Sequence, residues 1–292
     1  MIGGSFPDPC LLTLGHGYTA RALAARLDPE WRVVGTVRAR AACDDLRAEH
    51  VAPLLWDNRE AVEEAVGAAT HLLISAAPDA EGCPVLARFR AAFERAERLR
   101  WVGYLSTTAV YGDRGGDWVD ENSELRPSSR RGHWRVAAEE AWFELGERTG
   151  LPVHIFRLAG IYGPGRSAFD KLRDGRARRI IKPGQVFSRI HVADIASVLL
   201  ASMAKPDPGQ AYNVADDEPA PPQDVIVHAA GLLGVEPPPE EPFETAEMTP
   251  MARSFYGENK RVSNERIKTD LGVVLTYPNY RAGLAAILAA GG

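Results

Sequence analysis

The chain has 292 residues, of which 45% are hydrophobic and 25% are charged, and its formal net charge is -5. This composition is typical of a globular protein that buries a core of its own. It argues against a disordered, collagen-like or disulfide-scaffold protein. The negative net charge makes the chain as a whole a poor electrostatic partner for nucleic acid, so we expect no nucleic-acid partner.

The three cysteines, Cys10, Cys43 and Cys83, are isolated and lack the spacing of a metal site. We interpret them as reduced residues of a cytoplasmic protein and predict no metal site. The N-terminal sequence MIGGSFPDPC has no basic region before its short apolar run, so we expect no signal peptide. No apolar stretch approaches the roughly 20 residues that span a bilayer, and we expect no membrane partner.

Short apolar runs alternate with longer helical patterns in the first half of the chain. This alternation predicts a parallel sheet covered by helices on both faces, which is a doubly wound α/β fold. The expected strands are Cys10–Leu14, Trp31–Val37, Val51–Trp56, His71–Ala76, Trp101–Ser106 and Val153–Leu158. The expected helices are Tyr18–Leu27, Arg59–Ala68, Val85–Arg98 and Arg131–Thr149.

The pattern changes after Tyr162, where the sequence GPG interrupts the chain. We expect two short strands in Ile180–Ile190 around a KPGQ turn, and surface connections at Pro219–Pro222 and Pro237–Pro242. The remaining expected elements are a helix at Val192–Met203, a strand at Ala211–Val214 and a terminal helix at Arg281–Ala290.

These patterns divide the chain into two predicted domains. We predict a nucleotide-binding Rossmann domain of residues 8–165, completed by residues 186–215. Residues 166–185 and 216–292 are expected to form a smaller lobe.

The sequence GHGYTA at residues 15–20 follows the first expected strand and opens the first expected helix. Gly15 permits a tight turn, Gly17 allows the backbone to approach a pyrophosphate, and Ala20 keeps helix and strand close. The N-terminus of a helix also favours anionic phosphates. The turn therefore predicts a dinucleotide site, with an ordinary glycine turn as the alternative.

The end of the second expected strand selects between the two nicotinamide dinucleotides. An acidic residue there binds a free 2′-hydroxyl, whereas a basic residue accommodates a 2′-phosphate. The sequence GTVRAR at residues 35–40 has no acidic residue, and Arg38 could form a charge-assisted fork with a phosphate. We therefore favour NADP over NAD, and a solvated surface arginine is the alternative for Arg38.

Further segments follow the glycine turn in a characteristic order: STTAVYG at residues 106–112, RLAGIYGPG at 157–165, IHVADIA at 190–196 and YNV at 212–214. Together they resemble the extended short-chain dehydrogenase/reductase family, the nucleoside-diphosphate-sugar epimerase/dehydratase group, over nearly the whole chain. The resemblance implies a Rossmann-type sheet of about seven strands and a smaller C-terminal substrate lobe. It also implies that the long helix could form a dimer contact, so we expect a monomer or a homodimer.

The resemblance also assigns candidate site residues. Thr107 precedes Tyr111 by four residues and would hydrogen-bond the reacting oxygen of the substrate, whereas His191 and Asp194 would be structural. Small residues after the fourth strand would let the backbone pass under the cofactor. The implied cofactor-binding residues are Gly15, His16, Gly17, Tyr18, Thr19, Arg38, Asp57 near the adenine, Ser75, Ala76, Ala77 and Pro78.

The long helix departs from the family pattern, which carries Tyr-x-x-x-Lys there to transfer a proton and hold the nicotinamide ribose. Arg131 stands at the tyrosine position and Arg135 at the lysine position. Arginine does not titrate near neutral pH, so Arg131 cannot be the general acid, but Arg135 could hold a ribose hydroxyl. His133, Tyr111 and Tyr162 are alternative proton donors, and the pattern indicates an atypical branch of the family.

A second departure concerns the substrate. Nucleotide-sugar enzymes of the group place an arginine four residues before His191 to hold a phosphate, and Phe187 stands there in this chain. Arg189 lies two residues before His191 instead, which weakens the case for a nucleoside-diphosphate sugar. Basic residues in 126–135 and 171–182 indicate either a small anionic substrate or two solvated faces.

Two functions remain open from the sequence. The first is an NADP-dependent oxidoreductase or epimerase that acts on a small polar substrate, with Thr107 and Arg135 as catalytic candidates. The second is an NADP-binding sensor or interaction protein without turnover, which the missing Tyr–Lys pair favours. The intact Gly15/Gly17 turn argues against a degenerate fold that binds no dinucleotide.

Overall fold

A seven-stranded parallel sheet organises the protein, whose computed structural model describes residues 8–292. The strand order is β3-β2-β1-β4-β5-β7-β11, so the chain starts in the middle and winds outwards in both directions. This is the order of a Rossmann-type doubly wound sheet, and the predicted fold class is confirmed. The strands of the sheet are β1 (Cys10–Leu14), β2 (Arg32–Val37), β3 (Ala52–Leu55), β4 (His71–Ile74), β5 (Trp101–Thr107), β7 (Val153–Leu158) and β11 (Ala211–Val214).

Helices form many of the connections between the strands. A short 3₁₀ helix, η1 (Thr108–Tyr111), follows β5. The helices are α1 (Tyr18–Ala24), α2 (Ala42–Ala48), α3 (Arg59–Ala68), α4 (Pro84–Glu94), α5 (Arg130–Thr149), α6 (Ala168–Arg173), α7 (Val192–Ala204), α8 (Pro222–Leu233), α9 (Pro250–Phe255), α10 (Glu265–Thr269) and α11 (Tyr280–Ala289). Within the described residues, none of these helices combines the length and the apolar character that crossing a membrane requires.

The described chain forms two compact units. The first unit comprises residues 8–106, Trp134–Phe156 and Leu199–Ala211. The second unit comprises Thr107–His133, Arg157–Val198 and Tyr212–Gly292. The two domains expected from the sequence were defined by what each would bind, a nucleotide or a substrate. That assignment stays a prediction. The expected absence of a signal peptide rests partly on residues 1–7, which lie outside the described residues.

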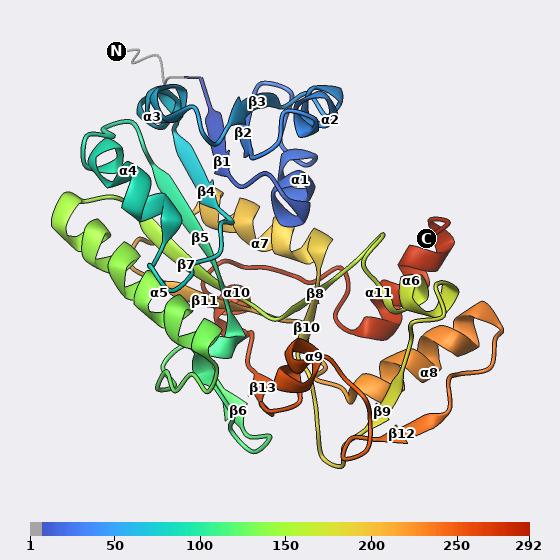
Figure 1. Cartoon of the computed structure of the whole chain (residues 1–292). Coiled ribbons are helices and arrows are strands. Elements are labelled where there is room, and N and C mark those ends of the chain that lie inside the picture. Colours follow the sequence, from blue (N-terminus) through green and yellow to red (C-terminus); the bar gives the residue numbers. More distant parts are fainter. Residues whose placement is uncertain (1–7) are drawn as a thin grey trace. The chain divides into compact units, whose positions relative to one another are not determined.

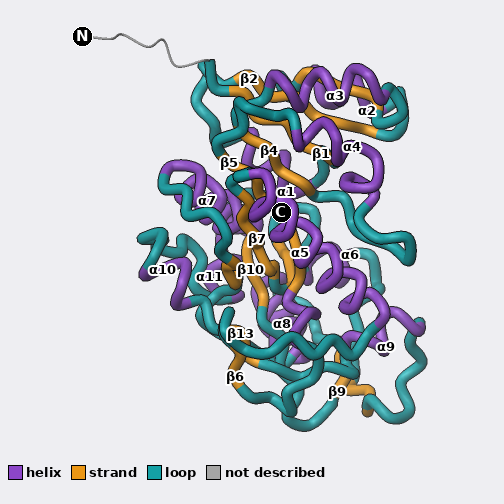
Figure 2. The backbone as a smooth tube through the Cα atoms, turned by 90° about the vertical axis from the view of Figure 1, so that its left-hand side faces the viewer, coloured by secondary structure: helices purple, strands orange, loops and turns teal. Residues whose placement is uncertain are grey.

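One face of the sheet in the first unit carries its main core. Side chains alternate between the faces of a strand, so Leu12 and Leu14 of β1 share a face with Leu72 and Ile74 of β4. All four are fully buried in a cluster with side chains of α3, α4 and α5. Figure 1 shows α3 and α4 on this side of β1 and β4, with α1 on the other, and Figure 2 looks onto α3 and α4 from their own side.

The opposite face of β5 is built around Trp101. Its indole nitrogen donates a hydrogen bond of 3.0 Å to the Ser202 hydroxyl of α7, which satisfies a fully buried polar group. A side chain at position 103 would overlap the Trp101 ring, so glycine is required at Gly103. Packing against Trp101 therefore explains a glycine inside an otherwise apolar strand.

The second unit has its own core between α6, α8 and α11. Phe169, Ala229 and Leu284 bury their side chains there together with Tyr162. A Cβ atom at position 283 would overlap the Tyr162 side chain, so Gly283 lets α11 pack directly against Tyr162. This core holds together segments that lie more than a hundred residues apart in the sequence.

The short strands β9 and β10 of the second unit do not pair with each other as a hairpin would. Both expected strands in Ile180–Ile190 form, as β9 (Arg179–Ile181) and β10 (Arg189–His191), but β9 pairs with β12 (Glu240–Pro242) and β10 with β8 (Gly160–Tyr162). The expectation that Pro237–Pro242 is only a loop was therefore wrong for its last three residues. A third parallel pair joins β6 (Trp118–Val119) to β13 (Arg261–Val262).

Candidate functional site

The glycine turn lies between β1 and α1 at the carboxyl end of the central strand. Gly15 has a φ of +94°, a conformation that favours glycine, and its N–H donates to the Thr36 hydroxyl of β2 at 2.8 Å. A Cβ atom on Gly15 would lie 3.5 Å from both the Ser75 Cβ and the Ala76 nitrogen, so the turn rests on the end of β4. Around Gly17, by contrast, no heavy atom would lie within 4 Å of such a Cβ. The turn is thus tied down on one side and open on the other.

His16 turns its side chain into the fold. Its N–H donates to the Thr36 carbonyl at 3.1 Å, and its Nδ1 lies 2.8 Å from the Thr13 hydroxyl. A Cβ atom on Gly35 would lie 2.9 Å from the imidazole, so the ring covers that glycine. Burial, with a smaller effect of Arg21, lowers the pKa of His16 to about 4 and keeps the ring neutral. The His16 side chain therefore supports the turn from inside the fold.

Arg38 follows β2 and is exposed. Within residues 8–292 its side chain has no hydrogen-bond or ion-pair partner, and the same holds for the side chain of Arg40. Two acidic side chains of the neighbouring α2 region are already paired, Asp44 with Arg47 and Glu49 with Arg21. The end of β2 therefore presents two uncommitted guanidinium groups.

The residues after β3 and β4 complete this edge of the first unit. Asp57 exposes its carboxylate, and its carbonyl accepts a 3.0 Å hydrogen bond from Arg88. The Ser75 N–H donates to the Leu14 carbonyl at 3.0 Å, which joins the end of β4 to the turn after β1. Of the other predicted cofactor residues, Thr19 and Pro78 are buried, Tyr18 and Ala76 are partly exposed, and Ala77 is exposed. The structure brings the turn, the end of β2 and the end of β4 together, as the sequence predicted for a parallel sheet.

Arg135 is anchored to the end of β5. Its Nη1 donates to the Leu105 carbonyl at 2.5 Å and to the Tyr104 hydroxyl at 3.2 Å. The other guanidinium nitrogens have no hydrogen-bond partner in the part of the chain that the structure describes. Arg135 is thus held in place by Nη1, and its other N–H groups can donate to a ligand.

Glu139 lies one helical turn beyond Arg135 and is almost completely buried. Its carboxylate accepts a hydrogen bond from the Ser106 hydroxyl, which fastens α5 to β5. Neither Ser106 nor Glu139 is among the site residues expected from the sequence. The four-residue spacing from Arg135 places Glu139 on the same helix face, and that spacing was the available indication.

Thr107 belongs to the second unit, where it caps η1. Its Oγ1 accepts a hydrogen bond of 3.3 Å from the Ala109 N–H. Its hydroxyl hydrogen has no acceptor among residues 8–292, and the residue is partly exposed. Thr107 can therefore donate a hydrogen bond to a ligand oxygen.

Tyr111 is fully buried and engaged on both sides. Its hydroxyl donates to the Asn213 side chain at 2.7 Å and accepts from Arg157 at 2.9 Å. Burial raises the pKa of Tyr111 to about 12, against the smaller opposing effect of Arg157. A phenol held in this way is a structural group, and the structure argues against Tyr111 as a proton donor at neutral pH.

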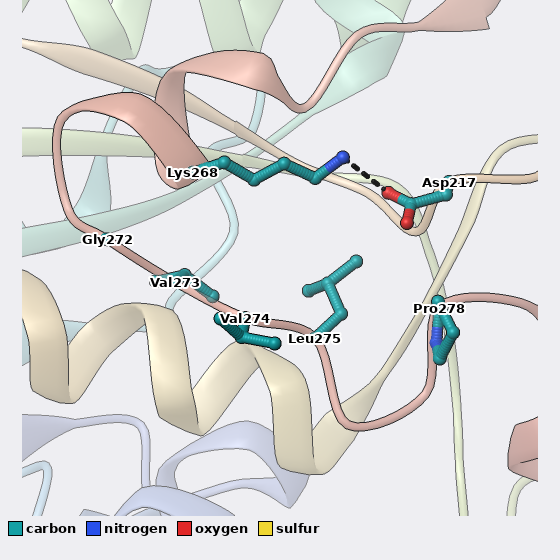
Figure 3. A pocket seen from close by; sticks show the side chains of 7 residues that line it. All are labelled: Asp217, Lys268, Gly272, Val273, Val274, Leu275 and Pro278. Atoms are coloured by element: carbon teal, nitrogen blue, oxygen red, sulfur yellow. Dashed lines mark ion pairs between the residues drawn. The ribbon is translucent and has the colours of Figure 1, made fainter.

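The hollow drawn in Figure 3 lies elsewhere in the second unit and measures about 430 Å³. Lys268 and Asp217 form an ion pair of 2.8 Å at its edge, and the opposite side is apolar. None of the predicted cofactor or catalytic residues lines it. Its lining residues are Asp217, Lys268, Gly272, Val273, Val274, Leu275 and Pro278. Within residues 8–292, no group of three or more His, Cys, Asp or Glu side chains could hold a metal ion.

Comparison with known proteins decides the family. Residues 10–215 match the NAD-dependent epimerase/dehydratase family. The chain belongs to this family, which is part of the extended short-chain dehydrogenases/reductases. The family resemblance seen in the sequence is therefore confirmed. The glycine turn lies within the part of the chain that matches this NAD-dependent family.

Relatives of this family member include one very similar structure. It is that of a functionally unknown conserved protein from Silicibacter pomeroyi DSS, with 58% identity, a TM-score of 0.92, and coverage of 97% of this chain and 99% of that one. Protein YeeZ of Escherichia coli K12 is 31% identical over 190 residues, which span 63% of this chain and 61% of YeeZ. A 3-diazoavenalumate denitrifying reductase from Streptomyces sp. is 28% identical over 190 residues, which span 59% of each chain. The chain thus matches less than two thirds of the length of these curated relatives.

Helix α5 contains no tyrosine. Arg131, which the resemblance aligns with the family tyrosine, is exposed, and so is His133, whose Nδ1 lies 3.0 Å from the Ser129 carbonyl. Tyr162 donates to the Asn279 carbonyl at 3.3 Å, and burial raises the pKa of its phenol far above the ordinary value. The Tyr162 phenol is therefore held as a structural group.

Proposed function

We propose that this family member is an NAD(P)-dependent oxidoreductase or epimerase that acts on a small polar substrate without the usual Tyr–Lys pair. The observation that carries the proposal is the glycine turn, in which Gly15 is tied to β2 and rests on β4 while Gly17 is open. The denitrifying reductase among its relatives is consistent with hydride chemistry. We further propose a cytoplasmic protein, since Cys10, Cys43 and Cys83 are free thiols, and a monomer or homodimer.

The described residues fit a dinucleotide. The open space around Gly17 allows a phosphate to approach the backbone at the start of α1. The backbone N–H groups at the N-terminus of a helix favour an anion. Bound NAD(P) would supply or accept the hydride. Tyr18, Thr19, Asp57, Ala77 and Pro78 remain predicted contacts.

The chain's own residues would orient the reactants. Thr107 would donate a hydrogen bond to the reacting oxygen, and Arg135 would donate its unused N–H groups to a ribose hydroxyl or to developing negative charge. Arg135 has a fixed direction because the Leu105 carbonyl holds one of its nitrogens. Thr107 and Arg135 would supply hydrogen bonds and not a proton, so the proton would come from the substrate or from water.

We propose NADP as the preferred cofactor, with NAD as the alternative. Arg38 supports this choice, because an uncommitted guanidinium at the end of β2 can form a charge-assisted fork with a 2′-phosphate. The acidic residue that would bind a free 2′-hydroxyl is absent from residues 35–40.

Titration of the protein with NADPH and with NADH, followed by quenching of tryptophan fluorescence, tests the proposal. We expect tighter binding of NADPH, and a loss of about ten- to hundredfold in NADPH affinity on Arg38→Ala, because a hydrogen bond to a charged group is removed. Arg32→Ala is the matched control, since Arg32 is exposed at the opposite end of β2. Equal affinity for both nucleotides would overturn the NADP preference, and binding of neither would overturn the oxidoreductase.

A catalytically silent NADP-binding sensor is the second candidate. It is favoured by Arg131, an exposed residue that cannot transfer a proton in place of the tyrosine. A sensor would bind NADPH without turning over any carbonyl substrate, and would capture a partner protein that depends on the ratio of NADPH to NADP. Turnover of any substrate by cofactor-saturated protein would exclude it.

A further inference from the structure

Arg189 carries a positive charge with few partners. Its Nη1 donates to the carbonyls of Phe187 at 2.8 Å and Ala220 at 3.0 Å, and neither acceptor is charged. Among residues 8–292, no carboxylate lies within ion-pair distance of Arg189, and its Nε and Nη2 have no hydrogen-bond partner. The guanidinium is therefore held in one place without a counter-ion.

The surroundings of this guanidinium are aromatic. Its central carbon lies 6.0 Å from the centre of the Phe187 ring, and Phe187 meets Tyr256 edge-on at 5.4 Å. Tyr256 in turn stacks on Phe243 at 5.3 Å. Burial lowers the pKa of Arg189, yet an arginine stays charged at physiological pH, and a buried charge without a partner is costly.

Asp216, the acid next to this arginine, does not supply the missing charge. The Asp216 N–H donates to the Arg189 carbonyl at 2.6 Å, so the two residues are adjacent in the fold. Burial raises the pKa of Asp216 to about 8, so its carboxyl group is mostly protonated at neutral pH. Its Oδ2 is buried without a hydrogen-bond partner in the described structure. The Arg189 guanidinium and the Asp216 carboxyl group, each with an atom that has no hydrogen-bond partner in the described part of the chain, therefore belong to residues adjacent in the fold.

Two other cations lie near the aromatic rings. Lys182 donates to the Tyr256 carbonyl, Arg253 donates to the Ala246 carbonyl at 2.7 Å, and both lie over the Phe243 ring. The fork formed by Nε and Nη2 of Arg189 suits a single carboxylate. The Phe187 ring beside this fork suits a planar group.

We propose that Arg189 recognises the carboxylate of a planar, aromatic or conjugated substrate. The inference rests on the proposed function, because it names the substrate class of that enzyme. Arg189 would bind the carboxylate through Nε and Nη2, and the neighbouring rings would contact the planar part of the molecule.

Calorimetric titration with benzoate, and with benzamide as its neutral match, tests this inference on the full chain with and without NADPH. We expect benzoate to bind at least tenfold more tightly than benzamide. Arg189→Gln should remove this difference, and Arg189→Lys should retain part of it because the charge remains but the fork is lost. Arg178→Gln is the control, since the Glu241 carboxylate already pairs with Arg178.

Equal binding of benzoate and benzamide would overturn the inference, as would unchanged benzoate affinity in folded Arg189→Gln. Inorganic phosphate that binds more tightly than benzoate would overturn the assignment to a carboxylate. If the Arg189 variants do not fold, a crystal structure of the wild type with benzoate decides, because the carboxylate must lie on Arg189. A protein that binds NADPH but not benzoate overturns only this inference, whereas one that binds benzoate but no nucleotide overturns only the cofactor proposal.

Discussion

Thr107 ends β5, and among the described residues its hydroxyl accepts a hydrogen bond without donating one. Its oxygen accepts the Ala109 N–H, and that contact orients the side chain while leaving the hydroxyl hydrogen to donate. Arg135 follows the same principle, since one nitrogen is anchored and the others are spare. At the scale of single residues, each candidate is positioned by the fold and retains a donor for a ligand.

Thr107→Ala should lower kcat by about 10²–10³-fold once a substrate is found, because it removes a positioned donor to the reacting oxygen. Thr107→Ser should retain most of the activity, since the hydroxyl remains. Thr108→Ala, a change at the neighbouring and equally half-buried position, should leave kcat nearly unchanged. Steady-state kinetics checks all three, and equal rates for Thr107→Ala and the wild type would exclude the assigned role.

Among the elements, α7 is the one that anchors the C-terminal segment. Asp194 lies in the first turn of α7, is fully buried, and accepts the N–H groups of Thr276 at 2.8 Å and Tyr277 at 2.9 Å. The Tyr277 ring also packs on His191 at 4.1 Å. One carboxylate therefore fixes the chain just before α11, which agrees with the structural roles expected for His191 and Asp194.

Asp194→Ala should lower the free energy of unfolding by about 3 kcal/mol, because two hydrogen bonds to one carboxylate are lost and both backbone N–H groups lose their partner. Asp194→Asn should cost roughly half as much, since one acceptor oxygen remains. Urea denaturation measures both, with Asp174→Asn as the control, because Asp174 pairs with Arg176 on the surface. A cost for Asp194→Ala no larger than that of the control would contradict the anchoring role.

For the molecule as a whole, buried histidines link stability to pH. Burial is the main cause that lowers the pKa values of His16, His71 and His154 to about 4 each. Between pH 6.5 and 4 the unfolded chain therefore binds protons at these positions that the folded chain does not. Asp216 and Glu121 act in the opposite direction, since burial raises their pKa values and the folded state holds their protons, but they are two groups against the three histidines.

The free energy of unfolding should consequently fall as the pH is lowered from 6.5 to 4, by up to about 1.4 kcal/mol per pH unit for each histidine. Urea denaturation at several pH values measures the slope. His71→Gln should flatten it, whereas His133→Gln should not, because His133 is exposed. A stability that is constant or rises towards pH 4 would show that the buried histidines do not govern it.

Local patterns predicted the larger elements well. The helix at Arg59–Ala68 and the strands Cys10–Leu14 and Val153–Leu158 have the expected bounds. Their apolar periodicity and the residues that begin and end them are local features of the sequence. Helix α8 was missed, although Pro222 at its start and Gly234 in the left-handed conformation at its end are ordinary helix boundaries. The strands β6 and β13 have two residues each, and nothing local marks them because each exists only through its partner.

The sequence by itself determined the sheet, its carboxyl edge and the glycine turn, since these depend on periodicity and on residues that are neighbours in the chain. Only the tertiary structure decided which polar groups meet. Ser106 and Glu139 lie 33 residues apart in the chain, Tyr111 and Asn213 lie 102 apart, and Asp194 and Tyr277 lie 83 apart. A hydrogen bond needs two groups within about 3 Å, and over such separations that distance is set by the packing of the whole chain.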